Sequence, residues 1–227
     1  MKKNHIVTAA LFAAVITLTG CGSSSAASIA ETTAAASAEA SAAPTADMTA
    51  EHEKFAGEYT GVAAWNAFSY GTQDDILAML KHGTGIVYLG FPSCPFCQAY
   101  VPMLNDAAMK NNVPVIYYDI KQDREDNSEF YQEVVSILGD NLDYDADGKP
   151  RIYVPDVSFV IKGEIIGHDN ESSMLSSKET SPEEYWTEEK KQALSTKLND
   201  LAAQVSEARS AVEDQGCDTS CEFTAGD

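Results

Sequence analysis

The feature that most constrains the fold of this chain is a pair of cysteines separated by two residues, Cys94-Pro95-Phe96-Cys97. Residues 85–91, just before the pair, form a short apolar run rich in β-forming residues, which predicts a buried strand. Residues 95–110 carry apolar side chains at helical spacing, and Pro102 is expected to kink this helix. The cysteines are therefore expected where a strand gives way to a helix.

This junction predicts different chemistry for the two thiols. Cys94 would lie at the helix N-terminus, where unpaired backbone N–H groups and the helix dipole favour a thiolate. A lowered thiol pKa makes Cys94 the expected nucleophile, and Cys97, one turn into the helix, is placed to resolve a mixed disulfide. Pro95 costs nothing there, because its missing N–H would have no partner in the first turn. The pair carries the electrons itself, so no organic cofactor is implied.

Two other roles are open to such a pair: half of a zinc site, or a structural disulfide. A zinc site needs two further ligands close by. The four histidines of the chain are scattered, and none of them stands beside a cysteine. Redox chemistry is therefore the favoured interpretation, and no metal is assigned to these residues.

The remaining patterns predict one α/β domain, a central mixed sheet flanked by helices. A helix is expected to begin at Thr72-Gln73-Asp74-Asp75, with Thr72 as its N-cap. A late hairpin turns at Lys162-Gly163. The other expected elements are strands over 113–120, 151–154, 157–161 and 164–168, a helix over 129–138 and a last helical region from Ser181.

The N-terminus predicts export. Lys2 and Lys3 precede an uncharged apolar run, residues 6–19, which at fourteen residues is too short to span a bilayer. The run ends in Leu18-Thr19-Gly20-Cys21, which resembles a bacterial lipobox, whose cysteine is acylated and becomes the new N-terminus. We expect residues 1–20 to be a lipoprotein signal peptide and Cys21 to be lipidated. An ordinary signal peptide is the alternative.

The composition then divides the rest of the chain. Residues 21–50 are mostly Ala, Ser and Thr and are expected to be a disordered linker. The folded domain is expected over 51–212, followed by a tail, 213–227, that contains Cys217 and Cys221. With Cys21 lipidated, the other four cysteines form two local pairs, which suits an oxidising compartment. A small surface disulfide is the expected role of Cys217 and Cys221, and a second redox pair is the alternative.

The charge of the chain excludes some partners. A formal net charge of −20 disfavours nucleic acid and repels anionic lipid headgroups, so membrane contact is expected through the lipid anchor only. Asp143, Asp145 and Asp147 match the first half of a calcium-binding EF-hand loop, but the twelfth position is Val154, where a glutamate is required. A turn-rich acidic loop is the favoured interpretation.

From about Thr72 to Leu201 the chain resembles the thioredoxin-like family. The resemblance rests on residues 85–97, on the strand over 113–120 and on Val154-Pro155. In this family a cis proline faces the active-site disulfide, and the residue before it offers its backbone to an extended substrate. The resemblance implies a cis Val154–Pro155 bond and a docking role for both residues; a trans proline at a sheet edge is the alternative. Phe96, large and apolar, is expected to help select the partner surface.

Two departures from thioredoxins proper qualify the resemblance. Ser93 stands before the first cysteine instead of Trp, and Tyr88 occupies the expected position of a buried Asp, whose proton-relay role is not carried over. Residues 88–97 also resemble the bacteriocin-transport accessory group of this family. We therefore expect an extracytoplasmic, membrane-anchored thiol–disulfide oxidoreductase acting on exported protein thiols and disulfides, with a membrane electron-transfer protein as a candidate partner. A binding or secretion accessory module without turnover is the alternative.

Overall fold

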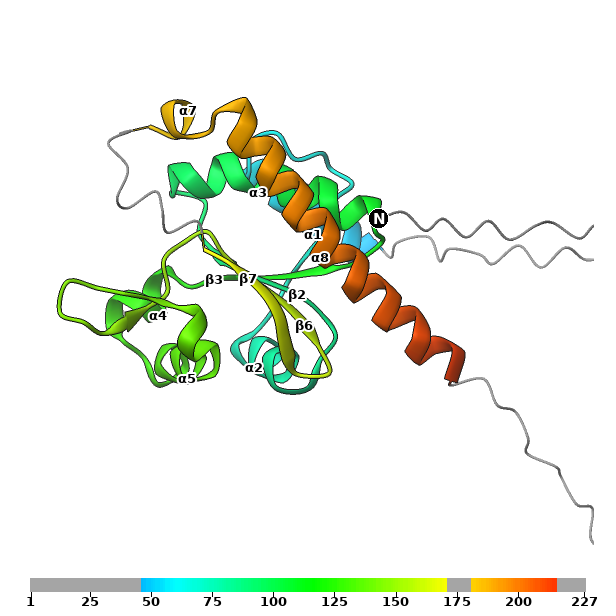
Figure 1. The fold of residues 1–227 in the computed structure, drawn as a ribbon. Coiled ribbons are helices and arrows are strands. Elements are labelled where there is room, and N and C mark those ends of the chain that lie inside the picture. Colours follow the sequence, from blue (N-terminus) through cyan, green and yellow to red (C-terminus); the bar gives the residue numbers. More distant parts are fainter. Residues whose placement is uncertain (1–45, 171–180, 216–227) are drawn as a thin grey trace, which may run out of the picture. The chain divides into compact units, whose positions relative to one another are not determined.

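A five-stranded sheet forms the centre of the computed structural model, which describes residues 46–170 and 181–215 (Figure 1). The strand order is β1-β3-β2-β6-β7. Neighbours β1, β3 and β2 are parallel, whereas β6 is antiparallel to both β2 and β7. The bounds are β1 Phe68–Tyr70, β2 Gly85–Gly90, β3 Val115–Asp119, β6 Asp156–Ile161 and β7 Glu164–Asp169. The expected mixed sheet within one α/β domain is confirmed.

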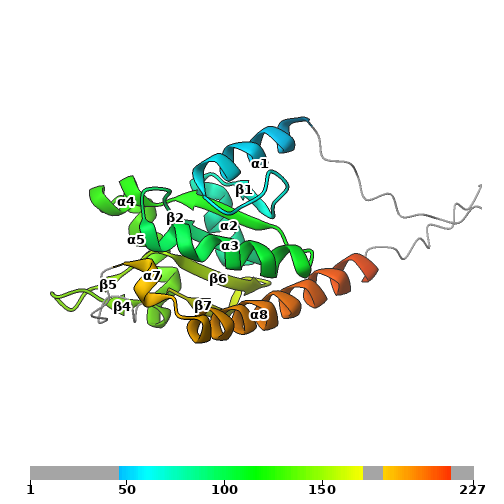
Figure 2. The same cartoon turned by 90° about the horizontal axis from the view of Figure 1, so that it is seen from above.

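Helices cover both faces of this sheet. On one face lie α1 (Ala46–Glu58), α3 (Pro95–Lys110) and α8 (Glu188–Gln215), and Figure 2 shows α3 between the other two. The opposite face is covered by α2 (Gln73–His82) and α5 (Glu129–Leu138). Strand β2 contributes apolar side chains to the core on both faces of the sheet, since its successive side chains point to opposite faces.

Local signals place several of these elements where they were predicted. Thr72 caps α2 in a capping box, in which its side chain accepts from the Asp75 N–H and the Asp75 carboxylate accepts from the Thr72 N–H. Helices α3 and α5 have the predicted bounds, and Pro102 lies inside α3. The hairpin of β6 and β7 turns at Lys162-Gly163, where both residues have positive φ.

The predicted strand over 151–154 is wrong. Only Pro150–Arg151 (β5) pairs, with Asp143–Tyr144 (β4), and these form a separate two-stranded sheet. Ile152 is fully buried among the α2 and α5 side chains, and its N–H donates to the Tyr131 hydroxyl at 3.2 Å. A tertiary contact therefore satisfies the backbone group that a strand would have paired.

The expected boundaries at the two ends of the domain also need correction. Helix α1 begins at Ala46, inside the predicted linker, because its Phe55 side chain packs into the core and holds the helix against the sheet. Helix α8 continues to Gln215, past the expected boundary at 212. The predictions for residues 1–45, Cys21, Cys217 and Cys221 lie outside the described residues.

The remaining elements are short: α4 (Lys121–Asp126), the 3-10 turn η1 (Gly139–Asn141) and α7 (Pro182–Tyr185). Within the described ranges, no helix combines the length and apolar character needed to cross a bilayer.

Candidate functional site

The two cysteines lie at the predicted junction between β2 and α3. Cys94 is the N-cap of α3, and its Sγ accepts a hydrogen bond from the Cys97 N–H at 3.2 Å. Pro95 is the first helical residue, where it removes no hydrogen bond. Cys94 is 8% exposed and Cys97 is fully buried, and both are free thiols in this structure. The pair is thus one outer and one inner sulfur.

The surroundings of Cys94 lower its thiol pKa to about 7. A hydrogen bond from the Cys97 thiol contributes most, and burial opposes it. The backbone N–H groups of Cys97 and Phe96 and the charge of Arg124 lower the pKa further. A thiol with this pKa is about half ionised at neutral pH, and the thiolate is the nucleophilic form.

Cys97 has the opposite electrostatics. Burial is the main influence and raises its pKa well above that of a free thiol, and Cys94 adds to the rise. Hydrogen bonds from the Phe91 backbone and the Tyr88 hydroxyl act against this effect. The buried Cys97 thiol therefore keeps its proton at neutral pH.

The loop before β6 brings Val154 and Pro155 to the cysteines from a distant part of the sequence. The Val154 carbonyl oxygen lies 3.9 Å from the Cys94 Sγ, and the Val154–Pro155 peptide bond is cis. Val154 is half-buried, whereas Pro155 is buried. The cis bond that the family resemblance implied is confirmed, and the Val154 carbonyl group lies beside the outer cysteine.

The two residues between the cysteines differ in exposure. Pro95 is exposed, whereas Phe96 is half-buried and meets the ring of Tyr185 edge to face, with ring centroids 6.0 Å apart. Phe96 therefore offers a partner only part of its surface, because α7 covers the rest.

Gln98 is a structural part of the site that the sequence patterns did not indicate. Its side-chain nitrogen donates to the carbonyl oxygens of Glu58 at 2.7 Å and Pro92 at 2.8 Å. Its side-chain oxygen accepts from the Thr60 N–H at 2.9 Å. Gln98 thereby ties the end of α1 to the turn that carries Cys94. A polar residue one turn into a helix gives no sequence signal for such contacts.

A buried ion pair follows the Pro155 loop and was also not predicted. Asp156 is 1% exposed, and its Oδ2 lies 3.1 Å from the Nε2 of His168. Burial raises the pKa of Asp156. Burial lowers the pKa of His168, but the Asp156 carboxylate outweighs it, so this pKa lies above its ordinary value. Asp156 pairs with Leu89 in the sheet, on the side that faces α2 and α5.

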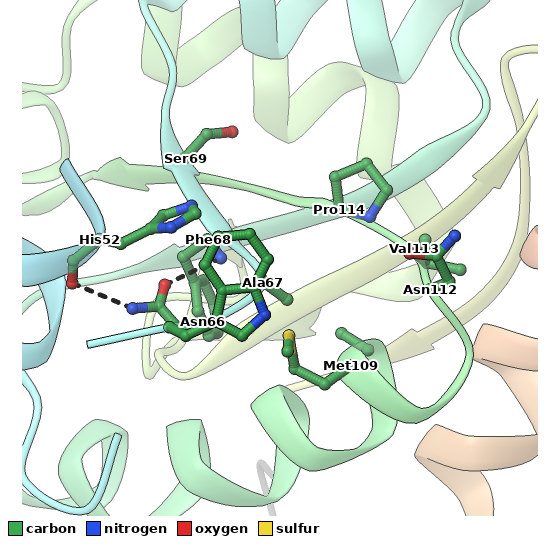
Figure 3. A pocket seen from close by; sticks show the side chains of 11 residues that line it. His52, Asn66, Ala67, Phe68, Ser69, Met109, Asn112, Val113 and Pro114 are labelled. Atoms are coloured by element: carbon green, nitrogen blue, oxygen red, sulfur yellow. Dashed lines mark hydrogen bonds between the residues drawn. The ribbon is translucent and has the colours of Figure 1, made fainter. Parts of the chain in front are cut away.

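A hollow of about 560 Å³ lies beside the cysteine turn. Eight residues from the turn, α3, α7 and the end of α1 line it: Thr60, Pro92, Ser93, Pro95, Gln98, Ala99, Pro182 and Glu183. A second cavity, of about 260 Å³, lies near the start of β1 and the end of α3 (Figure 3). Its lining includes His52, Asn66 and Met109 and none of the predicted site residues.

The acidic loop has the geometry of a hairpin turn. The Asp145 carboxylate accepts from the backbone N–H groups of Asp147 and Lys149, each at 2.9 Å, and closes the turn between β4 and β5. Within residues 46–170 and 181–215, no three His, Cys, Asp or Glu side chains are grouped as a metal site would require.

Neither the models of known protein families nor the solved structures gave a match to this chain.

Proposed function

We propose that this protein is a thiol–disulfide oxidoreductase of the thioredoxin-like family that acts on protein thiols and disulfides through Cys94 and Cys97. The carrying observation is the placement of the two sulfurs: Cys94 caps α3 and its Sγ accepts the Cys97 N–H at 3.2 Å, whereas Cys97 is fully buried one turn into the helix. The thiol pKa is accordingly lowered to about 7 at Cys94 and raised at Cys97. The position of the Val154 carbonyl beside Cys94 supports the family assignment, because the resemblance implies that this loop faces the cysteine pair.

The reduction of a substrate disulfide would take two exchanges. The Cys94 thiolate attacks one substrate sulfur, forms a mixed disulfide and releases the other sulfur as a thiolate. The Cys97 thiolate then attacks the Cys94 sulfur, which forms the Cys94–Cys97 disulfide and releases the second substrate sulfur. The substrate gains two electrons and the protein loses them. The same steps in reverse oxidise a dithiol.

The loop that carries Val154 would hold the substrate. Its carbonyl group lies within 3.9 Å of the Cys94 sulfur, so an extended peptide paired to the Val154 backbone would place its own sulfur at the nucleophile. Pro95 and the exposed part of Phe96 border the same position.

The cellular setting belongs to the proposal as well. A lipid on Cys21 would hold the acidic domain at the extracytoplasmic face of the cell membrane. Exported proteins would then be its substrates, and a membrane electron-transfer protein is the candidate that would reset the cysteine pair.

Trapping of mixed disulfides tests this function. The Cys97→Ala variant lacks the resolving thiol, so disulfide-linked complexes with exported proteins should accumulate through Cys94 and disappear on reduction. Cys94→Ala is the matched control and should trap none. If Cys97→Ala traps no more than Cys94→Ala, the domain uses its groove for binding without turnover, and the proposal fails.

A further inference from the structure

Three buried tyrosines lie behind the inner cysteine. Tyr88 of β2 is fully buried, and its ring stacks on that of Tyr117 with centroids 5.4 Å apart. The hydroxyl oxygens of Tyr88 and Tyr59 are 3.3 Å apart, as are those of Tyr59 and Tyr117. These residues come from β2, β3 and the end of α1, and they form a connected row of hydroxyl groups inside an aromatic core.

Gly90 directs the Tyr88 hydroxyl toward the cysteines. Residues two apart in a strand share a face, so the side chain of residue 90 would stand beside that of Tyr88. A Cβ atom at Gly90 would lie only 2.2 Å from the Tyr88 hydroxyl oxygen. The Tyr88 side chain therefore extends along the strand over Gly90, toward the end that leads to Cys94, and it packs in the same buried cluster as Cys97. The pKa of each of these two groups responds to the other.

The resolving step needs help at the inner sulfur. Cys97 must become a thiolate to attack, and a thiolate in a fully buried position is costly unless a donor reaches it. Burial raises the pKa of Tyr88 well above that of a free tyrosine, so its hydroxyl keeps its proton. Tyr88 therefore cannot remove the proton of Cys97, but it can donate a hydrogen bond to the thiolate.

We propose that Tyr88 is a catalytic group of the resolving step, whose hydroxyl donates a hydrogen bond to the Cys97 thiolate while Tyr59 donates in turn to Tyr88. This rests on the proposed function and adds a residue to it. Cys97 gives its proton to solvent, and its sulfur bonds to the Cys94 sulfur. The bond between Cys94 and the substrate breaks, and the substrate sulfur leaves with the electron pair and takes up a proton from solvent.

The hydroxyl row suits both forms of Cys97. A hydroxyl donates one hydrogen bond and accepts others, and its hydrogen can rotate. When Cys97 is a thiol, Tyr88 can donate to Tyr59, and Tyr59 can donate to Tyr117. When Cys97 is a thiolate, Tyr88 donates to Cys97 instead, and Tyr59 donates to Tyr88. Linked hydrogen bonds of this kind strengthen one another in a dry core. Replacing Tyr59 should therefore weaken the effect of Tyr88 without removing it.

Stopped-flow reaction of the fully reduced protein with dithiobis-nitrobenzoate separates the two steps. The first nitrothiolate release reports the attack by Cys94, and the second reports resolution by Cys97. Tyr88→Phe should leave the first release unchanged and slow the second about tenfold at neutral pH, because a hydrogen bond to a charged group is lost. The pH at which the rate of the second release reaches half its maximum should also be higher in Tyr88→Phe than in the wild type.

Tyr100→Phe is the matched control, since it removes another fully buried hydroxyl from the same core, one that donates to Asp169. Its second release should keep the wild-type rate and pH profile. Equal slowing in both variants, or an unchanged second release in Tyr88→Phe, would overturn the inference. If Tyr88→Phe does not fold, Tyr59→Phe is the second test. Its second release should be about threefold slower than in the wild type, and an unchanged rate would overturn the inference.

The same experiment keeps the two proposals apart. A wild-type protein that releases only one nitrothiolate has no resolving step, and then the proposed function itself fails. A wild type that releases both, with Tyr88→Phe and Tyr59→Phe matching it, rejects the role of Tyr88 alone.

Discussion

At the scale of single residues, the site depends on where each sulfur lies relative to the first turn of one helix. Cys94 caps α3 and receives hydrogen bonds from the backbone and from the Cys97 thiol. Cys97 lies one turn into the same helix and is fully buried. The same functional group thus acquires a lowered pKa in one position and a raised pKa in the other. Position relative to one helix thus gives the two thiols the contrast in pKa that the proposed roles of nucleophile and resolving thiol require.

Alkylation of the reduced protein measures this difference. The rate at Cys94 with iodoacetamide should rise with pH to half its maximum near pH 7, where the thiol ionises, and not near the ordinary value of about 8.5. Cys97 should react slowly over the same range, because it is buried and protonated. Mass spectrometry of peptides assigns the label to each cysteine. Similar rates at the two positions would contradict the assignment of Cys94 as nucleophile.

At the scale of elements, the site is held by contacts between α1, α3 and the loops between them and the sheet. Gln98 is central to this arrangement, because one side chain meets three backbone groups: the carbonyls of Glu58 and Pro92 and the N–H of Thr60. A shorter residue at this position would leave partly buried backbone groups without partners.

Replacing Gln98 by Ala should lower the free energy of unfolding by about 1–3 kcal/mol, because these hydrogen bonds are lost together. Chemical denaturation followed by circular dichroism measures it. Gln132→Ala is the matched control: Gln132 is exposed on α5 and donates to one backbone carbonyl, that of Asn127. Its loss should be below about 0.5 kcal/mol. Equal losses in the two variants would show that Gln98 does not secure the site.

Local sequence signals predicted the elements that begin and end through their own residues. The capping residue Thr72 and the cysteine turn indicated the starts of α2 and α3, so these helices could be found without knowing their neighbours. The cysteine pair could be found in the same way, whereas the role of Pro155 was inferred from the family resemblance.

What the patterns missed depends on contacts between distant residues. The three-residue strand β1 is defined by its pairing with β3, and the path of Ile152 by the Tyr131 hydroxyl. The same holds for the tyrosine row, whose members Tyr59, Tyr88 and Tyr117 are each unremarkable apolar positions until the fold brings them together. No local periodicity can reveal such meetings.

At the scale of the whole molecule, the proposed function places an acidic chain at a membrane, held there by a lipid on Cys21. The formal net charge of −20 keeps the folded part away from anionic headgroups, so attachment should depend on the lipid alone.

Replacing Cys21 by Ser should therefore abolish lipidation and leave the protein unprocessed or released from the membrane fraction. Membrane fractionation with metabolic fatty-acid labelling measures both effects, and Cys94→Ser, which keeps the anchor, is the control. Membrane retention of the Cys21→Ser protein, with cleavage at another residue, would contradict lipid attachment at Cys21.

The pairing of β2 with β6 has a consequence for how this protein can tolerate change. Leu89 lies opposite Asp156, so the chain leaves β2 for Cys94 beside the point where it enters β6 from Pro155. The proposed nucleophile and the proposed docking loop are thus both positioned by the pairing of β2 with β6. The hairpin of β4 and β5 lies in a separate sheet, so an insertion at its Asp147-Gly148 tip would not disturb the pairing of β2 with β6. This tip is accordingly the place to graft a recognition sequence and redirect the domain to a chosen substrate.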